Sequence, residues 1–247
     1  MRRPSAARIT AAALCTAAAL GLTACGSLLD DPGAQGPFAD LTGPEIINKA
    51  VATTRAATSV RMTVTTESAA GPVQVFVATD TRGKCTGTFS MGAAGTMELI
   101  RTDGTVYTKS DEAMLRGAGA AAAGSPSKDT DIKRLTGRWV TARPGDPRTA
   151  ESLRYCDPKR FLDRLAAKSE TFRPQKEATV AGTPSLTLTG KAGKPAGDKW
   201  AASVATEGKA YVLKMRIEDG ADGMEKPLTV EFSEFGKPFT AKKPALK

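Results

Sequence analysis

The side chains that could do acid–base or nucleophilic chemistry in this chain are carboxylates and lysines, because the sequence contains no histidine. The absence of histidine excludes Ser-His-Asp and Cys-His catalysis, His-ligated zinc and the commonest general acid–base. We expect the acidic candidates, which show no motif spacing, to be mostly solvated turn or strand residues: Glu67, Asp80, Glu98, Asp103, Asp111 and Glu112. The sequence therefore predicts a protein that is not an enzyme and that holds no cofactor and no metal.

The N-terminal residues have the pattern of an export signal. Three arginines lie in the first eight residues, and an Ala- and Leu-rich segment follows over residues 9–22. This segment is shorter than the roughly 20 apolar residues of a transmembrane helix, so residues 1–24 are predicted to be a signal peptide and are excluded from the fold. The signal ends in Leu22-Thr23-Ala24-Cys25, which resembles the bacterial lipobox.

The lipobox resemblance implies a chemical role for Cys25. Cleavage before this cysteine would free its amine, and its thiol would carry a thioether-linked diacylglycerol with acyl chains such as palmitate. Two or more chains anchor a protein stably, because each buried CH₂ contributes about 0.8 kcal/mol. We expect a lipoprotein held on the extracytoplasmic face of the cell membrane. The alternative is an ordinary secretory signal in which Cys25 has no such role.

Two further cysteines remain for the folded part, since Cys15 lies inside the signal peptide. In an oxidising compartment, Cys85 and Cys156 are most simply explained by a disulfide bond. Closing a loop of this length would contribute about 4 kcal/mol in the chain-entropy model. The sequence alone does not show that the two residues lie within reach of each other.

The chain is basic, with a formal net charge of +9. The signal peptide carries three arginines and no acid, so +6 remains for the mature protein. The basic residues are scattered and form no basic-plus-aromatic motif, so we expect no nucleic-acid partner. The charge suits an anionic membrane or wall surface.

The hydrophobic pattern predicts one domain of α+β class, mainly β, over residues 43–247. Residues 25–42 lack periodicity and form the predicted tether. A helix is predicted from Gly43 to about Ala57, because Thr42 is followed by Pro44 and an early acid. Alternating segments then predict about five strands on each side of a helical insert, bounded by glycines: 60–65, 73–78, 84–91, 96–102 and 105–109, then 171–180, 184–189, 200–206, 211–217 and 228–235. Asp103-Gly104 is a strong hairpin signal between the fourth and fifth of these segments.

The insert between the two sets of strands has a mixed character. Residues 113–128 are poor in large apolar groups and are predicted to form a mobile loop, with the Ala/Gly-rich segment 117–127 at its centre. Residues 139–140 suggest a short strand, and residues 150–156 and 158–168 suggest two helices. The second of these helices would place Phe161, Leu162 and Leu165 together on one face. An antiparallel sheet of this length curls, so we expect a half-barrel covered by a few helices with an apolar cavity between them.

The apolar face of the alternating strands supplies the candidate cavity residues. These residues would change faces together, because a one-residue shift in strand register would turn all of their side chains outward. The alternative is that they form a packed core. The set is Met62, Val64, Val75, Val77, Leu99, Leu186, Leu188, Leu213 and Met215.

Several segments of the sequence resemble a known group of proteins. The lipobox, the first helix with its strands, and the segments LIRTDGTVYTK (99–109), VAGTP (180–184) and LTVEFSEFGKP (228–238) are similar to LolA/LolB-like lipoproteins, especially the actinobacterial LppX/LprG-type branch. The resemblance implies a half-barrel wrapped over helices with a hydrophobic cavity for acyl chains. The cysteine pair and the Ala/Gly-rich segment depart from the general family pattern.

Two functions remain from different classes. The first is a carrier or chaperone that binds lipid or another acylated amphiphile by burying its chains, with the membrane as its site of action. The second is a regulatory or interaction module that senses the state of the envelope by binding a membrane protein partner. An open cavity favours the first function, and a collapsed one favours the second.

Overall fold

The computed structural model describes residues 37–68, 71–121, 129–142, 147–191, 199–218 and 227–246. These residues belong to one compact unit, Gln35–Lys247, whose hydrophobic core is built from its own side chains. The core begins before the predicted domain start, because Phe38 is buried in it and Leu41 packs against it. In the described part of the chain, no helix has the length and apolar character needed to span a bilayer.

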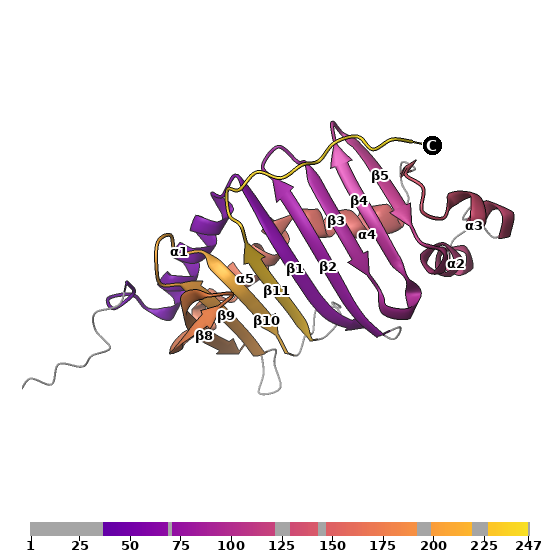
Figure 1. The fold of residues 1–247 in the computed structure, drawn as a ribbon. Coiled ribbons are helices and arrows are strands. Elements are labelled where there is room, and N and C mark those ends of the chain that lie inside the picture. Colours follow the sequence, from indigo (N-terminus) through magenta and orange to yellow (C-terminus); the bar gives the residue numbers. More distant parts are fainter. Residues whose placement is uncertain are drawn as a thin grey trace, which may run out of the picture. The chain divides into compact units, whose positions relative to one another are not determined.

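The strands form one antiparallel sheet in the order β6-β5-β4-β3-β2-β1-β11-β10-β9-β8-β7. Figure 1 shows the strands side by side, with helices α4 and α5 on one face of the sheet. The sheet is curled and is not closed into a barrel, which confirms the predicted fold class. Its strands are β1 (Ser59–Ser68), β2 (Gly71–Asp80), β3 (Cys85–Ser90), β4 (Thr96–Thr102), β5 (Thr105–Ser110), β6 (Val140–Thr141), β7 (Arg173–Val180), β8 (Thr183–Lys191), β9 (Lys199–Ala205), β10 (Val212–Ile217) and β11 (Leu228–Ser233).

The first and last strands join the two halves of the sheet. Met62 of β1 lies opposite Phe232 of β11, and Val64 lies opposite Val230. All four side chains are buried on the inner face, so the pairing brings the apolar faces of both halves into one core. The Asp103-Gly104 pair makes the β4–β5 turn with both φ angles positive, at 49° and 73°. This backbone matches the twist of a two-residue hairpin and explains the residue types.

Helices α1, α4 and α5 cover the inner face of the sheet, whereas α2 and α3 lie beside its β4–β5 end (Figure 1). Helix α1 contacts α5, β7, β9 and β10, whereas the short helix η2 contacts β2 and β3. Gly43 lets α1 begin against the chain before β7, because a Cβ there would lie 2.2 Å from the Phe172 carbonyl oxygen. The helices are α1 (Gly43–Arg55), α2 (Glu112–Ala121), α3 (Asp129–Leu135), α4 (Pro147–Leu153) and α5 (Pro158–Ala166), with the 3₁₀ segments η1 (Gly92–Ala94), η2 (Arg154–Cys156) and η3 (Ser169–Thr171).

One predicted loop is wrong in part. Residues 112–121 form helix α2, although the sequence predicted a loop over residues 113–128. The Asp111 carboxylate accepts hydrogen bonds from the Thr96 N–H at 2.7 Å and the Met114 N–H at 2.8 Å, so it fixes the start of the helix. Alanine is the best helix former, and a helix at the surface does not need large apolar groups. Residues 122–128 lie outside the described residues.

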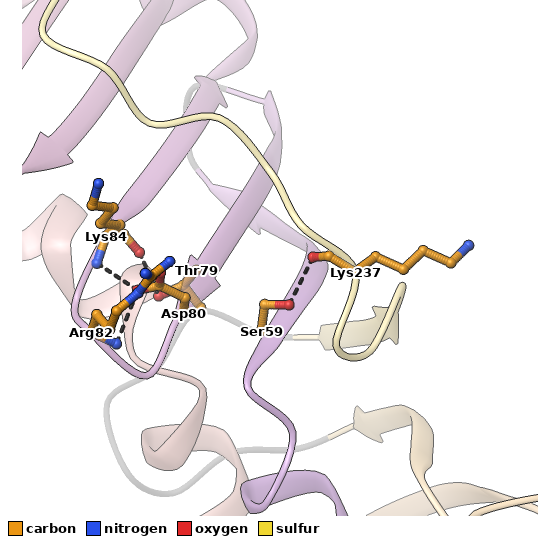
Figure 2. Close-up of polar contacts among 6 residues, drawn as sticks. All are labelled: Ser59, Thr79, Asp80, Arg82, Lys84 and Lys237. Carbon is orange, nitrogen blue, oxygen red and sulfur yellow. Dashed lines mark hydrogen bonds and ion pairs between the residues drawn. The ribbon is translucent and has the colours of Figure 1, made fainter.

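The C-terminal segment crosses the outer face of the sheet (Figure 1). Ser59 holds its start: the Ser59 hydroxyl donates to the Lys237 carbonyl oxygen at 2.7 Å, as Figure 2 shows, and the Gly236 N–H donates to the Ser59 carbonyl oxygen. Farther along, Ala241 is buried. The segment therefore covers part of the face opposite the helices.

Candidate functional site

A cavity of about 370 Å³ lies between the inner face of the sheet and the helical layer α4–η2–α5. Four strands, the segment around η1 and the helical layer contribute to its wall. The wall combines apolar, hydroxyl and charged side chains: Thr66, Ser68, Val73, Phe89, Met91, Ala94, Glu151, Ser152, Arg154, Tyr155, Arg160, Phe161 and Leu228.

The sheet side of the cavity follows from strand alternation. Thr66 of β1 lies opposite Val73 of β2, and both are the next inward residues after the buried pair Val64 and Val75. Phe89 of β3 lies opposite Val75 and is fully buried. The cavity is therefore continuous with the hydrophobic core, at the end of the strands where the helical layer stands away from the sheet.

The helical side of the cavity is made by η2 and α5. Tyr155 packs edge-on against Phe89, with ring centroids 5.8 Å apart, and lies 6.3 Å from Phe161. Helix α5 begins at Asp157, whose carboxylate accepts a hydrogen bond from the Lys159 N–H at 3.0 Å. Its buried face includes Phe161, Leu162 and Leu165, as the spacing predicted, and Phe161 also borders the cavity.

A disulfide bond holds the helical layer on the sheet. Cys85 at the start of β3 is joined to Cys156 at the end of η2, with their Cα atoms 5.9 Å apart. The Thr79 hydroxyl adds a hydrogen bond of 2.9 Å to the Cys156 carbonyl oxygen, and both groups are buried. These two links fix the layer near Cys85, while the cavity opens farther along β3, beside Phe89 and Met91.

Charged side chains stand at the rim of the cavity. Arg154 forms an ion pair with Glu151 at 2.7 Å, and both side chains are 56% exposed. An exposed pair of this kind contributes little to stability, about 0–1 kcal/mol. Arg160 is the third charged side chain among the described residues of the lining.

None of the nine predicted cavity residues lines this cavity. Seven are buried in the hydrophobic core: Met62, Val64, Val75, Val77, Leu99, Leu188 and Met215. Leu186 is partly buried and packs against the core. Leu213 is buried but does not belong to the core cluster. The pairing of β10 with β9 is irregular at this point, and the neighbouring Val212 lies in the core instead. Their role as a lipid cavity stays a prediction.

Sequence reasoning missed the residues that do line the cavity. Val73 and Phe89 continue the same strand alternation, which is the signal that could have found them. Thr66 also falls in that alternation, but a hydroxyl side chain does not mark an apolar face. Met91 ends the predicted strand 84–91, two residues after Phe89, and Tyr155 lies in the predicted helix 150–156. Neither pattern indicates a cavity, so the place of both residues depends on the tertiary structure.

Two other hollows are less suited to an apolar ligand. One of about 640 Å³ lies at the β7–β8–β9 end of the sheet, and five of its eleven described lining residues are charged, including Arg173, Lys191 and Lys199. Another, of about 410 Å³, lies on the outer face beside the exposed Phe76 and the C-terminal Thr240. Three of the predicted cavity residues also border this outer hollow: Met62, Val77 and Leu99.

The acidic candidates have structural roles and do not gather into one site. Asp80 closes the β2–β3 turn: its Oδ1 accepts hydrogen bonds from the Arg82 and Lys84 N–H groups at 3.0 and 2.9 Å, and its Oδ2 pairs with the Arg82 side chain (Figure 2). Asp103 lies in a turn, and Glu67 is exposed on β1. Within the described ranges, no cluster of three acidic or cysteine residues could hold a metal ion.

The remaining acids are paired or cap a helix. Glu98 of β4 binds Lys109 of the neighbouring strand at 2.8 Å, and Glu112 binds Arg116 one turn along α2 at 2.7 Å.

The predicted lipid attachment residue, Cys25, lies outside the described residues, as do the signal peptide and the tether up to residue 36. These parts stay predictions.

Comparison with known proteins identifies the fold. No family model matches the chain, and no curated protein matches it by sequence. The solved structure of LprF from Mycobacterium bovis matches with a TM-score of 0.52 and 17% sequence identity, over 82% of this chain and 97% of LprF. The Mycobacterium tuberculosis lipoprotein LppX matches with a TM-score of 0.51 and 12% identity, over 81% of this chain and 97% of LppX. At these identities the likeness shows the fold alone, and this chain therefore has the fold of LprF and LppX, as its resemblance to the LppX/LprG-type branch predicted.

Proposed function

We infer that this protein is a membrane-anchored extracytoplasmic lipoprotein that binds lipid or another acylated amphiphile, as a carrier or chaperone and not as an enzyme. The observation that carries the proposal is the cavity between the sheet and the helical layer. It is continuous with the core and combines an apolar interior, built on Val73, Phe89 and Phe161, with charged groups at its rim.

The physical basis of binding is the burial of apolar surface. Each Å² of apolar ligand surface removed from water contributes about 25 cal/mol, without a need for directed contacts. A volume of about 370 Å³ lies at the small end of ligand pockets, which span roughly 300–1,000 Å³. A longer chain therefore requires the wall to move. Met91 suits this role, because methionine is flexible and adapts to irregular apolar shapes.

The predicted location of the protein supports a carrier role. The lipobox resemblance implies a lipid on Cys25, and the mature chain would be basic, so it would be held close to an anionic membrane surface. A cavity fixed near that surface exchanges acyl ligands with the bilayer over a short distance. The disulfide at Cys85 would keep the helical layer in place while the far end of the cavity opens to admit the ligand.

The test is lipid extraction from the processed protein, followed by mass spectrometry and compared with two variants. Met91→Trp places an indole in the cavity and should abolish co-purifying lipid. Met97→Trp is the matched control, because Met97 also packs against the core from the sheet but does not line the cavity. The control should keep the lipid content of the parent.

The alternative function has an opposite outcome in the same experiment. A regulatory module that binds a membrane protein partner needs no acyl ligand in the cavity. A parent protein that carries no lipid, and that takes up none when incubated with vesicles, would contradict the carrier proposal and favour the regulatory function.

A further inference from the structure

Among the described residues, two buried polar side-chain atoms have no hydrogen-bond partner: Thr66 Oγ1 and Trp200 Nε1. Thr66 lines the cavity and is only 4% exposed. A buried hydroxyl without a partner destabilises the folded state, because it gives up its hydrogen bonds to water and receives none in return. Valine has nearly the same shape and lacks this penalty, so the stability of the fold does not account for a threonine at this position.

The surroundings of Thr66 on the sheet are apolar. Val73 lies directly opposite on β2, and Leu228 at the start of β11 borders the same cavity. Threonine carries both a methyl and a hydroxyl group on Cβ, so one rotamer step about χ1 decides which of them faces the cavity. A polar ligand atom in the cavity is therefore a suitable partner for the hydroxyl.

The charges of the same cavity favour one class of polar group. Among the described residues, the lining includes Arg154 and Arg160 together with the acid Glu151. Arginine at the rim of an apolar cavity attracts anionic oxygens, and hydrogen bonds to such oxygens are stronger than those between neutral groups. A carboxylate oxygen accepts a hydrogen bond from a threonine hydroxyl, whereas a hydrocarbon chain cannot.

We propose that the cavity takes an acyl ligand with a carboxylate at its polar end, and that the Thr66 hydroxyl donates a hydrogen bond to this group. This inference rests on the lipid-binding function proposed above and adds the ligand class and the residue that selects it. The apolar chain lies against Val73, Phe89 and Phe161, and the guanidinium groups at the rim favour an anionic oxygen over a neutral one.

The test compares Thr66→Val with Thr65→Val in the chain from residue 26 onward, which contains the whole compact unit and its core. Thr65 is the preceding residue on β1 and does not line the cavity, so it receives the same substitution on the opposite face. Two probes are used. N-phenyl-1-naphthylamine is apolar, contains no oxygen and fluoresces when it is buried, and palmitate is measured by its displacement of that dye.

We expect Thr66→Val to keep the melting temperature of the parent or to raise it, and to bind the dye unchanged. Its Kd for palmitate should rise about tenfold, the loss expected for one hydrogen bond to a charged group. Thr65→Val should bind both probes as the parent does.

Equal palmitate affinity in Thr66→Val and the parent would overturn this inference and leave the proposed function standing. A lower melting temperature with weaker binding of both probes would overturn it too, because the hydroxyl would then be structural. Failure of the parent to bind either probe would instead contradict the proposed function itself.

Discussion

The hydroxyl of Thr54 accepts a hydrogen bond of 2.9 Å from the backbone N–H of Val212, a residue 158 positions later in the chain. The same hydroxyl donates to the Ala50 carbonyl oxygen one turn earlier in α1. Thr54 and Val212 are both buried, so no water can replace the bond. This one side chain therefore fixes helix α1 to strand β10, at the point where the strand register is irregular.

Thr54→Val should destabilise the protein by about 1–3 kcal/mol, because it leaves the buried Val212 N–H without an acceptor. The matched control is Thr53→Val. Thr53 makes the same bond to the carbonyl four residues earlier, at Lys49, but it is not buried. The control should change stability by less than about 0.5 kcal/mol. Denaturant unfolding measures both, and equal effects would contradict the role assigned to the Val212 bond.

The second prediction concerns the disulfide. Replacing Cys85 and Cys156 together by alanine should lower stability by about 4 kcal/mol, since the bond closes a loop with a sequence separation of 71. The variant should also lose lipid, because η2 is then held to the sheet chiefly by Thr79. Peptide mapping without reductant should find the two cysteines linked. Two free thiols in protein purified from outside the cytoplasm would contradict this prediction.

The third prediction concerns the lipid anchor. Cys25→Ala should abolish labelling by lipid precursors, and the protein should stay unprocessed or be released from the membrane, because the thiol that carries the diacylglycerol is missing. Detergent partitioning measures the anchor directly. A processed variant that still enters the detergent phase like the parent would show that Cys25 is not the lipid attachment site.

The sequence was sufficient for most of the fold, because strand alternation and turn residues act locally. The Asp103-Gly104 hairpin, the start of α1 at Thr42 and the apolar face of α5 were all predicted correctly. Helix α2 was missed because a shortage of large apolar groups was interpreted as a loop, although alanine favours helix and Asp111 caps its start. The path of the C-terminal segment depends on Ser59, which is far from it in sequence.

The position of the cavity could not be predicted in the same way. Alternation identifies the inner face of a strand but does not say where the helical layer touches it. Val77 and Val73 lie on the same face of β2, yet Val77 belongs to the core without lining this cavity, whereas Val73 also borders it. The difference arises because the Cys85 disulfide draws the helical layer onto one end of the strands. The distance between the helical layer and each position of the sheet is a property of the tertiary structure.

The fourth prediction concerns pH. The Thr42 hydroxyl and the Thr42 N–H both donate to the Glu45 carboxylate at 2.7 Å, and these bonds lower the pKa of Glu45 from its ordinary value of 4.5. A lowered pKa in the folded state stabilises the protein above the unfolded pKa, and this contribution is lost as the pH falls through the folded value. Glu45→Gln keeps an acceptor but does not titrate. Its stability should therefore fall less than that of the parent below about pH 5, as measured by thermal unfolding, and identical pH profiles would contradict the prediction.

The last prediction separates a packed core from an open cavity at Val77. Val77 is 3% exposed and lies opposite Met62 and Gly87. A Cβ on Gly87 would come within 3.3 Å of the Val77 side chain, so there is little free space there. Val77→Trp should therefore cost about 1–3 kcal/mol through overpacking, whereas Met91→Trp should remove lipid with little change in stability. Thermal unfolding and lipid content are measured for both variants. A stable Val77→Trp protein that has lost its lipid would show that the cavity extends along β2 into the region that strand alternation alone predicted.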